Sequence, residues 1–226
     1  MGDWCIIGLL PSYLERENSS LVYMVNELVK RGGHENSGFY LNEFNELKAV
    51  LQQLRKAQQK TLLIGVTFAL LDFSEAFAAQ FQEGLFDNTI IMETGGMKGR
   101  RRELVRHQVH DILKQAFRVP DIHSEYGMTE LMSQAYSKGD GIFQCPPWMK
   151  IITRDEEDPL ETHPFMPGSK KSFSGALNII DLANIYSCSF IATDDIGKLY
   201  PDGSFEVLGR MDNSDLRGCS LLVLNS

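Results

Sequence analysis

Short apolar runs that alternate with amphipathic segments constrain the fold of this chain more than any other feature. The pattern predicts buried strands at 5–10, 61–67 and 88–93, and helices at 20–31, 43–58, 70–81 and 101–117. Strands separated by helices of this length are typical of parallel sheets, because each parallel connection has to cross a face of the sheet. We therefore expect an α/β fold, with a mainly parallel sheet and flanking helices, up to about residue 126.

The expected helix over 101–117 has the clearest amphipathic pattern. Its apolar stripe is expected to contain Val105, Val109, Ile112, Leu113, Ala116 and Phe117. The helix opens within the most basic run of the chain, "GRRREL" at 99–104, for which a solvated helix face is the simplest interpretation.

The pattern changes in the second half of the chain. Shorter strands are predicted at 148–153, 176–182, 189–193 and 205–208, with Pro, Gly and Asp turns between them. We expect an α/β subdomain over 1–135 and a smaller β-rich subdomain over 136–226.

Composition excludes several classes of function. The net charge of −8 disfavours a general nucleic-acid-binding protein, because phosphate attracts a basic surface. The four cysteines, Cys5, Cys145, Cys188 and Cys219, form no C-x-x-C pair, so a structural zinc site is not expected. Widely spaced cysteines suggest reduced thiols and a cytoplasmic location. The first residues have neither the basic start of a signal peptide nor the length of a membrane span.

Two local patterns leave alternatives open. Gly95, Gly96 and Gly99 stand between a predicted strand and a helix, where α/β folds bind anions, although the spacing also suits an ordinary tight turn. His107 and His110 stand beside Asp111 on the predicted helix. They are compatible with a metal site, but a solvated or hydrogen-bonded pair is the commoner arrangement.

Four short strings occur in a fixed order: "YGMTE" at 126–130, "TDDIGK" at 193–198, "PDG" at 201–203 and "GRMD" at 209–212. They resemble the strings Y-G-x-T-E, T-G-D-x-G, P-D-G and G-R-x-D of the adenylate-forming superfamily. That superfamily includes acyl-CoA synthetases, luciferases and peptide-synthetase adenylation domains. Within it, "LLIGVTF", "YGMTE" and "LRGCSLLV" look most like LuxE-like acyl-protein synthetases.

The resemblance implies roles for the residues of the first string. Tyr126 would stack on adenine, Thr129 would bind the α-phosphate, and Glu130 would hold Mg²⁺. These types suit the chemistry, because a hydroxyl donor and Mg²⁺ neutralise charge that develops at phosphorus. Gly127 would let the backbone approach the nucleotide. Taken singly, Tyr126 could instead be core packing and Glu130 a helix N-terminal acid.

Other residues are assigned by the same matching. Gly95 and Gly96 correspond to the glycine turn that flanks adenine, and Asp195 to the acid that holds the ribose hydroxyls. Arg210 corresponds to an arginine that contacts ribose or phosphate, and Asp212 to the hinge acid of a lid domain. Asp194 replaces the usual glycine of T-G-D. Asp195 could alternatively be a turn residue, and Arg210 part of a surface ion pair.

The resemblance has two departures. No Ser/Thr/Gly-rich phosphate loop precedes "YGMTE", and no full lid domain can follow "LRG", which together suggest the C-terminal part of a longer enzyme. Cys219 stands where LuxE-like enzymes carry their acyl-accepting cysteine. A thiolate there would form a thioester from an acyl-adenylate, with Arg217 favouring the thiolate, while a small buried hydrophobe is the alternative.

The leading hypothesis is thus an ATP- and Mg²⁺-dependent acyl-protein synthetase. It would activate a fatty acid or related carboxylate and pass the acyl group through Cys219 to a reductase or carrier protein. A second hypothesis is a non-catalytic half that serves as a partner-binding module. A third, a Rossmann-type methyltransferase, would need an acid after the strand at 88–93 to hold a ribose, and offers only Glu93.

Overall fold

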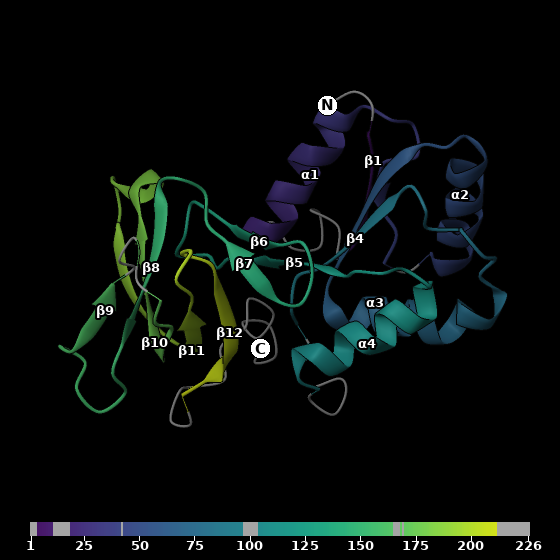
Figure 1. Ribbon diagram of the computed structural model, residues 1–226. Coiled ribbons are helices and arrows are strands. Elements are labelled where there is room, and N and C mark those ends of the chain that lie inside the picture. The colour runs from purple at the N-terminus through teal and green to yellow at the C-terminus, as the bar shows by residue number, and fades with distance from the viewer. Residues whose placement is uncertain are drawn as a thin grey trace, which may run out of the picture. The chain divides into compact units, whose positions relative to one another are not determined.

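The computed structural model describes residues 4–10, 19–41, 43–96, 104–164, 168 and 170–211 (Figure 1). It divides into two compact units, Met1–Ser124 and Glu125–Ser226. The "YGMTE" string therefore opens the second unit. The expected α/β fold, a mainly parallel sheet with flanking helices followed by a β-rich part, is confirmed.

A parallel sheet forms the centre of the first unit. Its strands lie in the order β2-β1-β3-β4-β5. Their bounds are β1 Trp4–Leu9, β2 Gly38–Phe39, β3 Lys60–Gly65, β4 Thr89–Glu93 and β5 His123–Tyr126. At the far edge, Glu93 of β4 lies in register with Ser124 of β5, so two strand ends that are distant in sequence meet there.

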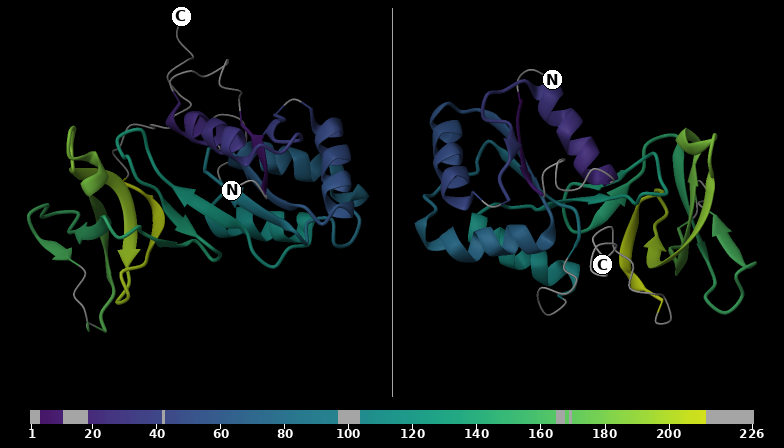
Figure 2. Two further views of the ribbon diagram at one scale, coloured as in Figure 1. Left: turned by 90° about the horizontal axis from the view of Figure 1, so that it is seen from above. Right: turned by 180° about the vertical axis from the view of Figure 1, so that it is seen from behind.

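Helices cover both faces of this sheet (Figure 2). They are α1 Ser20–Gly32, α2 Phe44–Lys56, α3 Thr67–Phe77 with the 3-10 turn η1 Ala78–Gln80, and α4 Arg106–Phe117. The ends of α1 follow from its sequence. The Ser19 hydroxyl accepts the Val22 amide at 3.4 Å, and Gly33 ends the helix at a φ of 63°, a conformation that glycine adopts readily.

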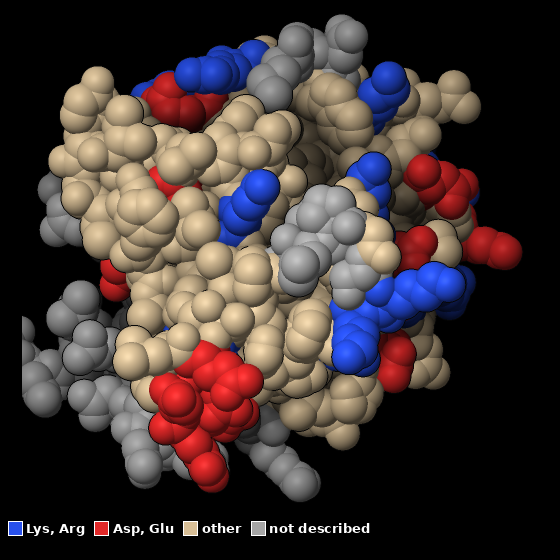
Figure 3. Space-filling view, turned by 60° about the vertical axis from the view of Figure 1, so that its left-hand side comes forward, with Lys and Arg blue, Asp and Glu red and all other residues tan. Residues whose placement is uncertain are grey.

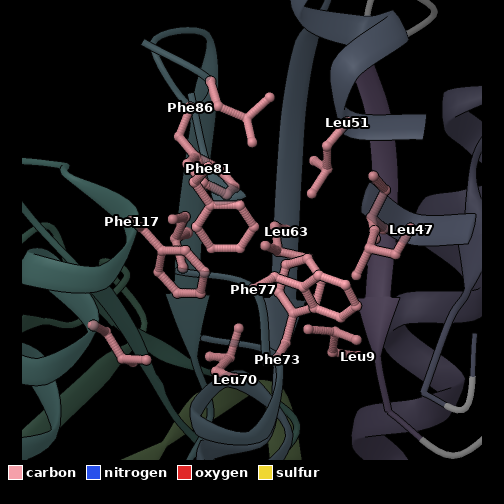
Figure 4. Close-up of a cluster of buried hydrophobic side chains, with 14 of the residues drawn as sticks. Leu9, Leu47, Leu51, Leu63, Leu70, Phe73, Phe77, Phe81, Phe86 and Phe117 are labelled. Atoms are coloured by element: carbon pink, nitrogen blue, oxygen red, sulfur yellow. The ribbon is translucent and has the colours of Figure 1, made fainter. Parts of the chain in front are cut away.

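The side chains of β1 alternate between two hydrophobic clusters. Ile7 and Leu9 join the larger cluster, which α2, α3 and α4 cover, whereas Ile6 packs with Val25 of α1 on the other face. The larger cluster is rich in aromatic rings (Figure 4), and its labelled members are Leu9, Leu47, Leu51, Leu63, Leu70, Phe73, Phe77, Phe81, Phe86 and Phe117. Burial of this apolar surface stabilises the unit and fixes the strand ends that carry Glu93 and Gly95.

The helix expected over 101–117 begins later than predicted. The structure starts α4 at Arg106, after the extended residue Val105, and residues 97–103 lie outside the described part. The predicted stripe is wrong at two positions, since Val105 is 51% and Ile112 is 39% exposed. His110 is buried in the stripe instead, because it has a hydrogen-bond partner in Ser124.

The strand expected at 61–67 is also shorter than predicted. It ends at Gly65, and α3 already begins at Thr67, three residues before the predicted helix start. The chain leaves the sheet here because the Thr67 amide bonds the carbonyl of Gly95 at 2.9 Å, in place of a strand partner.

An antiparallel sheet forms the second unit. The order is β6-β7-β12-β11-β10-β8-β9. The bounds are β6 Ala135–Ser137, β7 Ile142–Gln144, β8 Met149–Arg154, β9 Thr162–Pro164, β10 Phe173–Asp181, β11 Phe190–Leu199 and β12 Phe205–Arg210, with the 3-10 turn η2 Leu182–Asn184 after β10. The strand expected at 189–193 continues to Leu199, so "TDDIGK" lies in β11 and not in a turn.

The connection between β8 and β9 is acidic and exposed, with Asp155, Glu156, Glu157 and Asp158 all at the surface. Figure 3 shows one face of the molecule on which acidic side chains gather in a group beside a broad area without charge. Among the described helices, none combines the length and the apolar character that crossing a membrane requires.

Candidate functional site

The strongest polar link in the second unit joins two of the resemblance strings. Tyr126, at the end of β5, donates a hydrogen bond from Oη to Oδ2 of Asp195 at 2.7 Å. The Tyr126 ring is 7% exposed and packs against Phe143 and Phe205, with centroids 5.8 and 5.5 Å away. The hydrophobic cluster thus orients the phenol, and the phenol orients the carboxylate.

Arg210 lies on the other side of the same carboxylate. Its Nε is 3.6 Å from Oδ1 of Asp195, and its Nη2 is 3.6 Å from Oδ2 of Asp194. Residues 195 and 210 are also paired across β11 and β12. Burial, followed by the negative charge of Asp195, raises the pKa of Tyr126 far above its ordinary value. The phenol therefore stays a hydrogen-bond donor at every physiological pH.

A buried arginine fixes the strand segment that leads to Asp195. Arg154 donates to the carbonyls of Leu177 at 3.2 Å and Thr193 at 2.7 Å, and to Oδ1 of Asn178 at 2.6 Å. Thr193 in turn accepts the amide of Asp195 on its hydroxyl at 3.2 Å. These bonds span β8, β10 and β11 beside a bulge in the pairing of β10 with β11. They hold the strand in the irregular course that it takes there.

The loop after β5 presents the remaining residues of the first string. Thr129 and Glu130 are exposed at the surface. Gly127 leaves room for two neighbouring side chains, because a Cβ there would lie 3.2 Å from Cγ of Gln134 and closer still to the Glu125 carboxylate, and both would have to shift. Beyond the string, Met132 and Ser133 donate hydrogen bonds to Asp181, which sequence reasoning did not identify.

The glycine turn lies in the first unit. Gly95 and Gly96 have φ values of 77° and 91°, in the region that favours glycine. Their carbonyls accept the amides of Thr67 and Phe68, so the turn caps the N-terminus of α3. The amide of Gly95 donates to Oε1 of Glu93 at 2.6 Å.

Glu93 is a buried carboxylate with donors on both oxygens. Thr67 and Gly95 donate to Oε1, and the Ser124 hydroxyl donates to Oε2 at 3.3 Å. Because that hydroxyl is used as a donor, Ser124 Oγ accepts from Nε2 of His110 at 3.1 Å. Burial alone would raise the pKa of Glu93. The contact with His110, the charge of Arg106 and the bonds from Thr67 and Gly95 together hold the pKa below its ordinary value.

This network bears on two hypotheses from the sequence, a metal site at the histidine pair and a methyltransferase that uses Glu93. His110 is 4% exposed and bonded to Ser124, whereas His107 and Asp111 on the same helix are exposed. Across the described residues, no group of three or more His, Cys, Asp or Glu side chains could hold a metal ion. Both oxygens of Glu93 are already bonded within the protein, Oε1 by Thr67 and Gly95 and Oε2 by Ser124, which leaves the methyltransferase hypothesis without the ribose-binding acid that it needs.

Several predicted residues lie outside the described part of the chain. These are Gly99, Asp212, Arg217 and Cys219. Within the second unit, the structure brings together Tyr126, Asp195 and Arg210. Gly95 and Gly96 belong to the first unit. Sequence reasoning named Glu93 only as a possible ribose-binding acid, although an acid that ends a buried strand two residues before a glycine pair is a detectable signal of its role in the turn.

No protein-family model matches the sequence, and no curated protein does so either. Solved structures do resemble this one. An ATP-bound MatB from Rhodopseudomonas palustris matches with a TM-score of 0.61 and 14% identity, covering 93% of this chain and 41% of that one. A long-chain-fatty-acid–CoA ligase from Archaeoglobus fulgidus matches with a TM-score of 0.57 and 14% identity, covering 92% and 44%.

An amide bond synthetase, McbA from Marinactinospora thermotolerans, matches with a TM-score of 0.55 and 14% identity, covering 93% of this chain and 42% of that one. These neighbours are adenylate-forming enzymes, and this chain spans about two fifths of their length. At such identities the likeness concerns the fold, and the fold of this chain is that of a segment of the adenylate-forming enzymes.

Proposed function

We propose that this chain forms the adenylate-binding part of an ATP-dependent ligase that activates a carboxylate, such as a fatty acid, as an acyl-adenylate. One observation carries the proposal: the bond between Tyr126 and Asp195, with Arg210 beside the same carboxylate. Two strings that are distant in sequence meet there, in a chain whose fold matches adenylate-forming enzymes.

The proposed reaction begins with attack by a carboxylate oxygen of the substrate on the α-phosphorus of ATP. A new O–P bond forms, the bond to the β-phosphate oxygen breaks, and pyrophosphate leaves. Asp195 would accept hydrogen bonds from the ribose hydroxyls, and Arg210 would hold a phosphate or ribose oxygen. The Thr129 hydroxyl would donate to an α-phosphate oxygen as negative charge grows there.

Tyr126 has a different role in this proposal from simple stacking. Its buried ring offers little surface, and its hydroxyl is bonded to Asp195. We therefore assign it first to the orientation of the ribose-binding acid. Stacking on adenine stays a prediction of the sequence resemblance, as does the contact of Gly95 and Gly96 with adenine.

Glu130 fits a role in Mg²⁺ binding. It is a single exposed carboxylate next to the exposed Thr129. Mg²⁺ at nucleotide sites is usually held by one or two carboxylates together with substrate phosphates, so no larger protein cluster is required. When bound, the ion would neutralise negative charge on the phosphates.

The finer proposal concerns the fate of the acyl group. Cys219 thiolate would attack the acyl carbonyl, the bond to AMP would break, and a thioester would form that a reductase or carrier protein then accepts. This part rests on the LuxE-like sequence "LRGCSLLV" at 216–223. A Cys219→Ser variant should lose the acyl-protein that hydroxylamine cleaves, and its persistence would exclude Cys219 as the acceptor.

The nucleotide site can be tested by calorimetry with an acyl-sulfamoyl adenosine, a stable mimic of the acyl-adenylate. The wild type is expected to bind in the micromolar range or tighter. Asp195→Asn should abolish measurable binding. Asp194→Asn is the matched control, because it removes the same charge one residue away and also lies 3.6 Å from Arg210.

Equal losses in the two variants would indicate a general charge effect and not a ribose-binding acid. No binding by the wild type would contradict the adenylate site and favour the alternative, a partner-binding module. Pyrophosphate exchange, measured on a chain that binds the mimic, would then separate a complete ligase from a part that binds without turnover.

A further inference from the structure

Asp181 is a fully buried carboxylate at the end of β10. It accepts four hydrogen bonds. Oδ2 receives the amides of Met132 and Ser133, both at 2.9 Å, and Oδ1 receives the Ser133 hydroxyl at 2.7 Å and the Ala183 amide at 3.1 Å. Three of these donors belong to the loop that starts with "YGMTE". The loop is thereby tied to a strand 48 residues further along the chain.

The direction of these bonds explains why the residue is an aspartate. The indole Nε1 of Trp148 donates to Ser133 Oγ at 2.9 Å, so that oxygen is an acceptor there and its proton points to Asp181. All four partners of Asp181 are therefore donors. An asparagine would place its amide NH₂ against two of them, whichever way it turned. Only an ionised carboxylate satisfies the whole set.

A second side chain holds the same loop, from the 3-10 turn that directly follows Asp181. Asn184, in η2 directly after β10, is 8% exposed. Its Nδ2 donates to the backbone carbonyl of Glu130 at 2.8 Å and to that of Cys188 at 3.0 Å. Glu130 thus has its backbone held by the β10 end while its side chain stays exposed.

We propose that Asp181 and Asn184 are positioning residues that hold the 129–133 loop in place for phosphate and Mg²⁺. The inference rests on the proposed function, since it concerns what Thr129 and Glu130 would bind. It goes beyond that function by assigning the orientation of the phosphate-facing loop to residues outside every recognised string. Neither residue would touch the nucleotide.

Different residues would accordingly position the two parts of the site, the one that binds the ribose and the one that binds the phosphates. Asp195 is oriented by Tyr126 and Thr193, whereas the 129–133 loop is oriented by Asp181 and Asn184. Loosening the second support should affect ligands that carry phosphates and spare those that do not. A general loss of stability would not discriminate between the two kinds of ligand.

The experiment compares the affinities for ATP·Mg²⁺ and for adenosine, both by titration calorimetry. In Asp181→Asn we expect the affinity for ATP·Mg²⁺ to fall about tenfold or more, as for the loss of hydrogen bonds to a charged group, with adenosine binding within about twofold of the wild type. Asp155→Asn is the matched control. Asp155 also accepts two backbone amides in the second unit, those of Glu157 and Asp158, but it lies in the exposed connection between β8 and β9 and outside every string, so this variant should leave both affinities unchanged.

A second variant keeps the test informative if Asp181→Asn fails to fold. Asn184→Ala removes only the bonds to two backbone carbonyls, and should show the same selectivity with a smaller loss. Equal weakening of both ligands, or no change in either variant, would overturn the role of these residues while leaving the proposed function intact. Failure of the wild type to bind either ligand would instead overturn the proposed function, and with it this inference.

Discussion

Tyr126 and Asp195 stand 69 residues apart in sequence, and their side chains meet at 2.7 Å. One end of the pair is packed among aromatic rings, and the other approaches Arg210. Hydrophobic packing in the second unit therefore fixes the phenol, and the phenol orients the Asp195 carboxylate through this bond. Its contribution can be measured separately from any nucleotide.

Tyr126→Phe should lower the free energy of unfolding by about 2 kcal/mol, because it removes a hydrogen bond to a charged group and keeps the ring. Tyr200→Phe is the matched control. Tyr200 donates a bond of the same 2.7 Å length to Glu206, but in a more exposed position, so the loss should stay below about 1 kcal/mol. Urea unfolding of both variants provides the comparison. Equal losses would show that the buried bond has no special importance.

Glu93→Gln should make the protein less sensitive to acid. The pKa of Glu93 is held below its ordinary value of 4.5, so its ionised form stabilises the fold above that pH. This stabilisation is lost as the pH falls through the lowered pKa, because the native state must then bind a proton. The difference in unfolding free energy between wild type and variant should be about 2–3 kcal/mol at pH 7 and should shrink below pH 4.5.

The control for the acid experiment is Glu27→Gln. Glu27 is paired with Lys30 at 2.9 Å on the exposed side of α1, and its pKa is lowered by that partner. Because the pair lies at the surface, where solvent screens it, its replacement should leave the urea midpoint unchanged at either pH. A constant difference between wild type and Glu93→Gln across the pH range would contradict the assigned ionisation.

Gly175→Ala should destabilise the second unit strongly, by about 3 kcal/mol or more. A Cβ at Gly175 would lie 2.2 Å from the carbonyl oxygen of Arg154, and a backbone atom cannot move away as a side chain can. Gly209→Ala, also in a strand of this sheet, meets nothing within 4 Å and should be neutral. Thermal unfolding of the two variants measures the difference, and similar melting temperatures would disprove the close approach.

Arg154→Lys should be nearly as harmful as Arg154→Met, although it keeps the charge. The guanidinium reaches acceptors on two strands with separate nitrogens, and a single ammonium cannot reproduce that fork. Both variants should lose about 3 kcal/mol of stability. They should also weaken adenosine binding, because Arg154 holds Thr193, and the Thr193 hydroxyl accepts the amide of Asp195. Full function in Arg154→Lys would show that only the charge matters.

Sequence reasoning predicted the elements of the first unit well, because its strands are continuous apolar runs and its helices are amphipathic. It failed at the start of α4, where Val105 fits the helical period yet remains outside the helix and exposed. It failed in the same helix at His110, because a polar residue can be buried only when a partner satisfies it. That partner, Ser124, lies in β5, and no local pattern shows that this strand packs against α4.

The candidate site was predicted in part for a related reason. Tyr126, Asp195 and Arg210 belong to recognisable strings, and the structure brings them together. Asp181 and Arg154 belong to no string, and each acts on backbone groups of distant strands. Since backbone donors and acceptors are the same at every residue, nothing in the sequence marks which ones a buried side chain will contact.

The arrangement of four donors around Asp181 has a consequence for the recognition of distant relatives. Residues 181 and 133 depend on each other chemically, as the hydroxyl of Ser133 is directed to the carboxylate by Trp148. Natural variation at the two positions should therefore be coupled. Lineages that keep the aspartate should keep a serine or threonine 48 residues before it, and lineages that lose one should lose both. Such a pair would trace descent even where the short strings have diverged.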